Sequence, residues 1–343
     1  MTSALRNLRV GLIGAGRWAG LHREALATLG VTPTAVLVSS ESSAERVARD
    51  WNVHAFHEAS AFFEVNLDAV IIASPNHLHA RQAIAALERG LHVLVEKPMA
   101  LTVDDAEAVV AAAERTGRVL AVGHEIRTFA WAEEAKRLID RGVLGTPRHV
   151  HLGLWRRPYR AGAGGWKADP AKLGSSILEE PIHYLDLAAW WLGPVTGLQA
   201  FATSRAGRET AWENLDVRLW TPEAQASVTR SIAAWGHRVT VEIVGDEGAY
   251  RAEWTGRMDA DASPTVLGWL HRGEDRDAPP EPLALRSQTG HAFDLPRQAE
   301  AFLRACLGEG DVIATGLEGV AAVRLSLAAE RSLREGEVRI DNP

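Results

Sequence analysis

Two acids and a histidine lie close together in one largely apolar stretch of the chain. Glu179 and His183 are four residues apart and Asp186 follows three residues later, so the three share one face if residues 177–192 form a helix. A histidine can move a hydroxyl proton near neutral pH, and a nearby carboxylate orients it and raises its basicity. The alternative is a helix salt bridge or a capped core histidine, which is commoner for an isolated pair at this spacing.

A glycine-rich turn precedes the first helical stretch of the chain. Gly14-Ala15-Gly16-Arg17-Trp18-Ala19 follows a short apolar run and matches G-x-G-x-x-A, the dinucleotide fingerprint with alanine in third place. Gly14 permits the tight turn, Gly16 lets the backbone approach a pyrophosphate, and the helix N-terminus attracts the phosphates. We predict that Gly14, Gly16, Arg17 and Trp18 contact a dinucleotide.

The residues after the second apolar run bear on the choice between NAD and NADP. An acid about 20 positions beyond the turn grips the ribose 2′-hydroxyl of NAD, but this chain has Ser39 and Ser40 there. The two serines remove the repulsion that a 2′-phosphate would meet, although Glu41 is adjacent and no Arg or Lys follows directly. The pattern predicts NAD(P) binding with a slight preference for NADP.

Short β-branched runs alternate with helical stretches in the first part of the chain. The runs span residues 8–13, 34–38, 69–73, 92–95 and 119–122, and helical stretches span 43–51, 77–89 and 103–115. This alternation implies βαβ units and a parallel sheet covered on both faces. We predict a doubly wound Rossmann domain over residues 1–123.

After Gly123 the pattern changes to longer runs in which apolar and polar residues alternate. The runs span residues 148–156, 197–203, 215–221, 226–232 and 239–244, helices are expected over 131–141, 177–192, 291–307 and 317–334, and a long loop over 259–290. Alternation of this kind predicts a largely antiparallel sheet with one solvent-exposed face. The predicted fold class is therefore α/β: a Rossmann domain followed by an α+β domain, residues 124–343, with a large, mostly antiparallel open sheet.

Several motifs occur together in one order along the chain. After the glycine turn come Ser74-Pro75-Asn76-His77-Leu78-His79, then Glu96-Lys97-Pro98, then Gly123 with Arg127, and finally Gly174-Ser175 with Glu179, His183 and Asp186. With these motifs the chain resembles the Gfo/Idh/MocA oxidoreductases (glucose–fructose oxidoreductase, inositol dehydrogenase and relatives) from residue 10 to about 340. The resemblance implies an NAD(P)-dependent oxidoreductase acting on a sugar, a polyol or a related hydroxy or keto compound.

Lys97 is the strongest catalytic candidate besides the acid–histidine element. It is expected at the carboxyl end of a parallel strand, where such sheets place their ligands. An ammonium group there can hold a substrate oxygen and stabilise alkoxide charge while hydride moves to or from a nicotinamide. The alternative is a surface lysine at a strand end. The predicted catalytic residues are Lys97, His183 and Glu179.

The resemblance also implies which residues surround the cofactor and the substrate. The cofactor set adds Ser74, Pro75, Asn76, His79, Glu96 and Lys97 to the residues above. The substrate set comprises Arg127, Trp166, Lys167, Glu179 and His183, because an indole stacks on sugar C–H faces and cationic side chains hold hydroxyl or carboxylate groups. Arg156, Arg157, Arg160 and Lys167 form a basic stretch, which makes a sugar acid a candidate substrate. The alternative for Arg127 is a structural ion pair.

The chain departs from the family pattern at two positions. Glu179 stands where the family usually has Asp, and Ser175 stands where a second glycine is usual. The longer glutamate can bond the substrate, pair with Lys97 or change the pose of His183, so these alternatives stay open.

Composition and charge exclude several other classes of protein. The 37 basic and 44 acidic residues give a net charge of −7, which argues against a role in coating nucleic acid. The single cysteine, Cys306, cannot form an intramolecular disulfide or build a zinc site by itself, and no metal site is predicted. No apolar run is long enough to span a membrane, and no secretory signal is recognised, so a cytoplasmic protein is expected. An open sheet face predicts a homodimer or homotetramer.

Two other functions fit the same motifs. One is a glycosidase or lyase that keeps NAD bound and oxidises its substrate transiently. The other is a non-catalytic dinucleotide-binding regulator.

Overall fold

The chain folds into two compact units, each assembled from more than one segment. The computed structural model describes residues 4–157, 163–204, 212–256, 264–273, 275–286 and 294–340. The first unit contains residues 1–125, 161–174 and 294–323, and the second contains residues 126–160, 175–293 and 324–343.

A six-stranded parallel sheet forms the centre of the first unit. Its strands are β1 (Val10–Ile13), β2 (Ala35–Leu37), β3 (His54–Phe56), β4 (Ala69–Ile72), β5 (His92–Glu96) and β6 (Leu120–Gly123), in the order β3-β2-β1-β4-β5-β6. Every neighbouring pair is parallel. The strand order reverses between β1 and β4, and the predicted doubly wound Rossmann sheet is confirmed.

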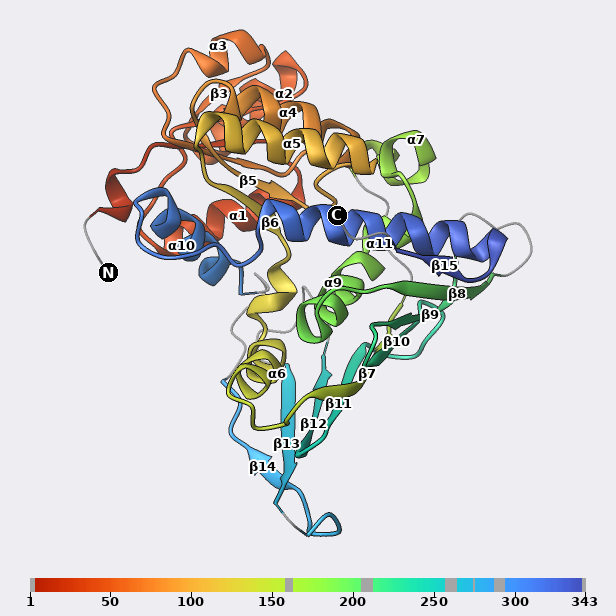
Figure 1. The fold of residues 1–343 in the computed structure, drawn as a ribbon. Helices are drawn as coiled ribbons and strands as arrows, with labels where there is room; N and C mark the ends of the chain where they lie inside the picture. The colour runs from red at the N-terminus through yellow and green to blue at the C-terminus, as the bar shows by residue number, and fades with distance from the viewer. Residues whose placement is uncertain are drawn as a thin grey trace. The chain divides into compact units, whose positions relative to one another are not determined.

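Helices cover both faces of this sheet and make two separate cores. The helices are α1 (Arg17–Thr28), α2 (Glu41–Trp51), α3 (Ala59–Phe63), α4 (His79–Leu87), α5 (Val103–Thr116) and α10 (Leu295–Cys306). Apolar residues of α4 and α5 pack on one face of the strands, and those of α1 and α10 pack on the other (Figure 1). The strands are buried on both faces, which accounts for their uniformly apolar sequences.

Two segments from later in the chain, residues 161–174 and 294–323, belong to the first unit. The predicted division at residue 123 does not include these segments in the Rossmann domain. Helix α10 packs against α1, and Thr315 forms a β-bridge to Ala121 in β6. The 3₁₀ helix η4 (Ala163–Ala168) and α7 (Pro170–Leu173) also belong here, and α7 packs on the 3₁₀ helix η2 (Asn76–Leu78). Such long-range packing leaves no local sequence signal.

The second unit is built on a nine-stranded sheet. Its strands are β7 (Pro147–Trp155), β8 (Gly197–Thr203), β9 (Asn214–Trp220), β10 (Gln225–Ser231), β11 (Arg238–Gly245), β12 (Gly248–Thr255), β13 (Thr265–Arg272), β14 (Glu281–Leu283) and β15 (Val338–Arg339), in the order β14-β13-β12-β11-β7-β10-β9-β8-β15. All neighbours are antiparallel except β10 and β7. The mostly antiparallel sheet is confirmed, but the loop predicted over 259–290 was wrong because β13 and β14 lie within it. Gly268 interrupts the alternation of β13, and β14 has only three residues.

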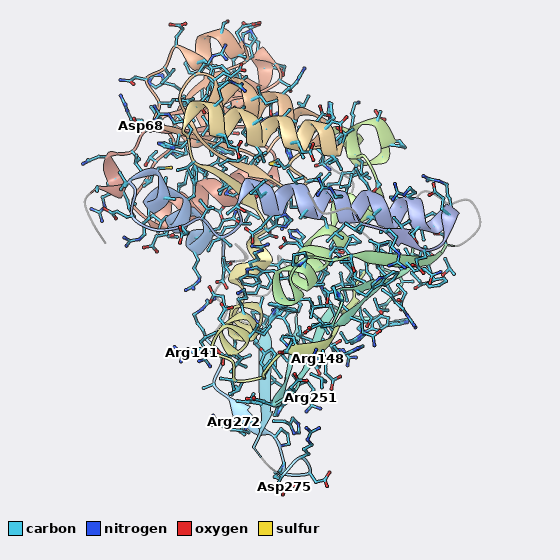
Figure 2. All side chains as sticks on the ribbon, viewed as in Figure 1. Asp68, Arg141, Arg148, Arg251, Arg272 and Asp275 are labelled. Carbon is cyan, nitrogen blue, oxygen red and sulfur yellow. The ribbon has the colours of Figure 1, made fainter. Side chains whose placement is uncertain are left out.

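Helices pack on one face of this sheet, and among the described residues several apolar side chains of the other face are exposed. Helices α6 (Ala130–Asp140) and α9 (Pro181–Leu192) contact its strands, and Figure 1 shows both on the same side. Phe201, Val244 and Leu267 lie on the opposite face with 55%, 42% and 46% of their surface exposed. On that face Arg251, labelled in Figure 2, stacks on Trp269 from the neighbouring strand.

The remaining elements are short or link the two units. They are the 3₁₀ helices η1 (Leu5–Asn7) and η3 (Glu125–Thr128), the four-residue helix α8 (Ser176–Glu179), and the long helix α11 (Gly316–Glu335), whose residues divide between the units at Val323 and Arg324. Among the residues that the structure describes, no helix has both the length and the apolar character needed to cross a membrane.

Candidate functional site

The glycine turn lies at the carboxyl end of β1, beside β4. Gly14 has a φ of +107°, and a Cβ there would lie 2.6 Å from the Ala73 carbonyl oxygen, so a larger residue would not fit. Gly16 is the N-cap of α1, and the space where its Cβ would point is open. No side-chain hydrogen bond caps this helix at Gly16, and the N-terminus of a helix attracts a phosphate. Arg17 is exposed and Trp18 half-buried in the same turn.

The two serines after β2 have different roles in the structure. Ser40 is the N-cap of α2, and its hydroxyl oxygen accepts a hydrogen bond from the Ser43 N–H at 3.3 Å. Ser39 is exposed. The hydroxyl of Ser40 is therefore partly occupied in starting a helix, whereas Ser39 faces solvent at the carboxyl edge of the sheet.

The loop after β4 uses its polar side chains to bind other parts of the protein. The Ser74 hydroxyl donates to Gln82 Oε1 at 2.6 Å, and the Asn76 amide donates to the Leu173 carbonyl at 3.0 Å. Asn76 is buried and so fixes the 163–174 segment onto this loop. The Ser74 hydroxyl and one N–H of the Asn76 amide thus have protein acceptors.

His79 bridges the loops that follow β4 and β5. It is 1% exposed, and its Nδ1 lies 2.8 Å from the Pro98 carbonyl oxygen while Nε2 lies 2.8 Å from the Ser74 carbonyl oxygen. Burial lowers the pKa of His79, and the two carbonyl acceptors oppose that effect. Its position therefore fits a structural bridge rather than direct cofactor binding.

Lys97 directly follows β5, and a buried carboxylate lies beside its peptide group. Glu96 Oε1 lies 2.7 Å from His22 Nε2, and Glu96 Oε2 accepts from the Lys97 N–H at 3.3 Å. A Cβ on Gly123, which pairs with Glu96 in the sheet, would lie 2.7 Å from that carboxylate. Burial alone would raise the pKa of Glu96, but the hydrogen bond and charge of His22, together with the hydrogen bond from Trp18 and the charge of Lys97, outweigh it and hold the pKa below its usual value. The Lys97 side chain is half-buried.

The acid–histidine stretch is not one continuous helix, so the prediction of a shared helical face was wrong for Glu179, whereas His183 and Asp186 both lie in α9. Glu179 ends α8, Glu180 leaves the helical conformation with φ −133°, and Pro181 starts α9. Proline restricts the residue before it and donates no hydrogen bond, which separates the two helices here. His183 is buried in the first turn of α9, whereas Glu179 is half-buried before the break.

Arg127 and Asp186 form a buried ion pair within the second unit. The guanidinium binds both carboxylate oxygens, at 2.8 and 2.7 Å, and the two side chains are 2% and 3% exposed. The guanidinium also lies over the Trp190 ring, 4.9 Å from its centroid. This geometry matches the structural alternative stated for Arg127.

The predicted basic stretch is partly neutralised. Arg156 pairs with Glu180, which is buried, whereas Arg157 is exposed and Arg160 lies outside the described residues. Trp166 and Lys167 belong to the first unit, and the Lys167 ammonium lies 5.5 Å from the centroid of the Trp166 ring. The positive charge of Arg156 is therefore already paired with Glu180, and Arg156 does not support binding of an acidic substrate.

Sequence reasoning missed two residues that organise these groups. They are His22, which binds Glu96, and Glu180, which binds Arg156. Gly123, which the sequence motifs already included, leaves room for the Glu96 carboxylate. Only His22 carried a signal, as a polar residue among the apolar positions of α1 that face the sheet.

The glycine turn lies at the switch point of a Rossmann sheet, and Lys97 follows the end of a nearby strand of the same sheet. Together they define a dinucleotide-binding protein that can carry out redox chemistry with a bound nicotinamide.

Comparison with known proteins agrees with this class. Residues 8–124 match the model of the GFO_IDH_MocA oxidoreductase family with its NAD-binding Rossmann fold, and residues 132–251 match the GFO/IDH/MocA C-terminal domain. The chain belongs to the Gfo/Idh/MocA family of oxidoreductases.

Individual relatives extend over most of the chain. The uncharacterized oxidoreductase YdgJ of Escherichia coli is 34% identical over 249 residues, which are 71% of this chain and 70% of that protein. The scyllo-inositol 2-dehydrogenase (NAD(+)) of Bacillus subtilis is 26% identical and covers 96% of this chain and 95% of its own length. In structure, the aldose-aldose oxidoreductase of Caulobacter crescentus, crystallised with glycerol, superposes with a TM-score of 0.82 over 98% of this chain and 100% of that chain, at 23% identity.

Proposed function

We propose that this protein transfers hydride between a nicotinamide cofactor and a CH–OH or C=O group of a sugar, a polyol or a related compound. The observation that carries the proposal is the half-buried Lys97, directly after β5 in the sheet that holds the glycine turn. Support comes also from family membership and from relatives named for inositol and aldose oxidoreduction.

Different residues of this chain would bind the substrate, stabilise charge and transfer the proton during the reaction. The bound nicotinamide supplies the hydride donor or acceptor. The Lys97 ammonium holds the substrate oxygen and stabilises the alkoxide charge that develops as the C–H bond breaks. A ring nitrogen of His183 takes the hydroxyl proton in the oxidative direction and returns it in the reductive direction, and Glu179 orients the substrate or the histidine. We propose Trp166 and Lys167 as substrate contacts, through stacking and hydrogen bonding.

We propose NAD(P) as the cofactor, with a slight preference for NADP set by Ser39 and Ser40. No carboxylate occupies positions 39 or 40, which favours acceptance of a 2′-phosphate, while Glu41 in the first turn of α2 opposes it. The family description and the name of the Bacillus subtilis relative refer to NAD.

A panel of sugars, polyols and their acids, assayed with added NAD and NADP through the absorbance of the reduced nicotinamide, tests the function. We expect turnover of at least one neutral member and a higher kcat/KM with NADP than with NAD. A clear NAD preference would contradict the interpretation of Ser39 and Ser40. Turnover without added cofactor would instead support the NAD-retaining glycosidase or lyase. Cofactor binding without turnover of any member would support the regulator.

We also propose that the protein self-associates through the exposed face of its nine-stranded sheet, as a dimer or tetramer. The exposed Phe201, Val244 and Leu267 on that face support this. Light scattering after size exclusion should give a multiple of the 37.2 kDa chain mass. Phe201→Lys and Leu267→Lys together should shift the distribution toward the monomer, whereas a monomeric wild type would contradict the proposal.

A further inference from the structure

Two buried histidines bind the residues on either side of Lys97. His22 bonds to the side chain of Glu96, and His79 faces the carbonyl of Pro98. Both histidines are 1% exposed and both belong to the first unit. The proposed function requires neither of them to touch substrate or cofactor.

The His22 contact ties Lys97 to helix α1. The Glu96 carboxylate accepts from the ring of His22 at 2.7 Å and from the Lys97 N–H at 3.3 Å. Because the low pKa of Glu96 keeps it ionised, the bond to His22 is a charge-assisted one in a buried place. One carboxylate thus connects the Lys97 peptide to the helix whose first turn follows the glycine turn.

The His79 contact ties the same segment to the loop after β4. Carbonyl oxygens only accept hydrogen bonds, so neutral His79 donates either to Pro98 or to Ser74, and the imidazolium form donates to both. In either form the ring is enclosed by these two carbonyl groups, 2.8 Å from each nitrogen. Movement of the segment after β5 away from the loop after β4 would break this contact.

We infer that His22 and His79, with Glu96, are positioning residues that fix the backbone of Lys97 from both sides and so set where its ammonium group lies. The inference rests on the proposed function, in which Lys97 acts at the reacting oxygen. A long, flexible lysine side chain is useful there only if its anchor is held, because a displacement of about 1 Å can lower a rate on the order of 100-fold. Gly123 belongs to this arrangement, since a side chain there would displace the carboxylate.

The composition of the chain allows a direct test that needs no substrate. The protein has only four lysines, which are Lys97, Lys136, Lys167 and Lys172. Reductive ¹³C-methylation should therefore give few dimethyl-lysine signals, and loss of one signal in a Lys97→Arg variant assigns it. We expect the Lys97 signal to move toward the position of solvent-exposed lysines in His22→Met and His79→Met, which keep the side-chain bulk and remove the donor.

Rescue variants and a matched control separate positioning from general destabilisation. Gln at position 22 returns a donor near the Nε2 position, and Asn at position 79 returns one near Nδ1, so both should restore much of the Lys97 signal. His92 lies at the other end of β5, where its ring accepts a hydrogen bond from the Val119 N–H at 3.0 Å. His92→Met should therefore leave the Lys97 signal unchanged.

Once an active substrate is known, the His22→Met and His79→Met variants should lose about 10- to 100-fold in kcat with little change in the KM for the cofactor.

The outcomes distinguish failure of this inference from failure of the proposed function. Folded His22→Met and His79→Met variants with an unchanged Lys97 signal overturn the inference, whatever the activity. An inactive panel, or an active Lys97→Ala, overturns the function while the lysine signals still report on positioning. If a Met variant does not fold, ¹⁵N-histidine spectra of the wild type decide: slowly exchanging ring N–H protons of His22 and His79 are expected, and their absence overturns the inference.

Discussion

Replacing Lys97 with alanine should lower kcat by about 100- to 1,000-fold, the usual effect of removing a group that stabilises a developing oxyanion. The cofactor dissociation constant should change little, because the phosphates are expected at the glycine turn after β1, whereas Lys97 follows β5. Steady-state rates on a substrate from the panel, together with quenching of protein fluorescence by NADH or NADPH, measure the two quantities separately.

A matched lysine serves as the control for the Lys97 variant. Lys172 is 47% exposed and pairs with Asp169 at 3.1 Å, so Lys172→Ala should retain wild-type kcat. Near-normal activity in Lys97→Ala would refute the catalytic assignment. Equal losses in cofactor affinity and kcat would indicate that Lys97 serves cofactor binding instead.

Replacing Arg127 with methionine should destabilise the protein by about 3–5 kcal/mol, because it leaves the Asp186 carboxylate buried without its partner. Urea unfolding followed by tryptophan fluorescence provides the measurement. The double variant Arg127→Met with Asp186→Leu should recover a large part of the loss, because replacing both members of a buried pair by apolar side chains is often close to neutral.

An exposed ion pair of the same unit gives the comparison for Arg127. Arg148 and Asp246 are 43% and 47% exposed and bind in the same two-pronged way, so Arg148→Met should cost no more than about 1 kcal/mol. A loss of similar size at both positions would show that burial does not set the cost. Wild-type activity in the folded double variant would show that catalysis does not need this ion pair.

The sequence was most informative where chemistry depends on neighbours along the chain. The glycine turn, the strand-and-helix alternation and the lysine after the fifth apolar run all follow local rules of turn geometry and burial, and the structure confirms the Rossmann sheet built on them. The break before α9 also had a local cause, Pro181, which the helical pattern around it obscured.

Hydrogen bonds and ion pairs between residues far apart along the chain could not be predicted from the sequence. Glu96 and His22 are 74 positions apart, and Arg127 and Asp186 are 59 apart. Whether a charged residue faces solvent, substrate or an opposite charge depends on which element packs over it, and residue spacing contains no information on that. The same reason explains why Arg156 was counted as free charge although it binds Glu180.

The start of helix α1 has a consequence beyond cofactor recognition. Helices α2 and α5 begin with Ser40 and Thr102, whose side chains bind the first turn, but α1 begins with Gly16, which has no side chain to do so. An anionic ligand would complete this helix in the way that a capping residue completes the others. Order in the first turn of α1 and affinity for the ligand are then thermodynamically linked, and any change that favours one favours the other by the same factor.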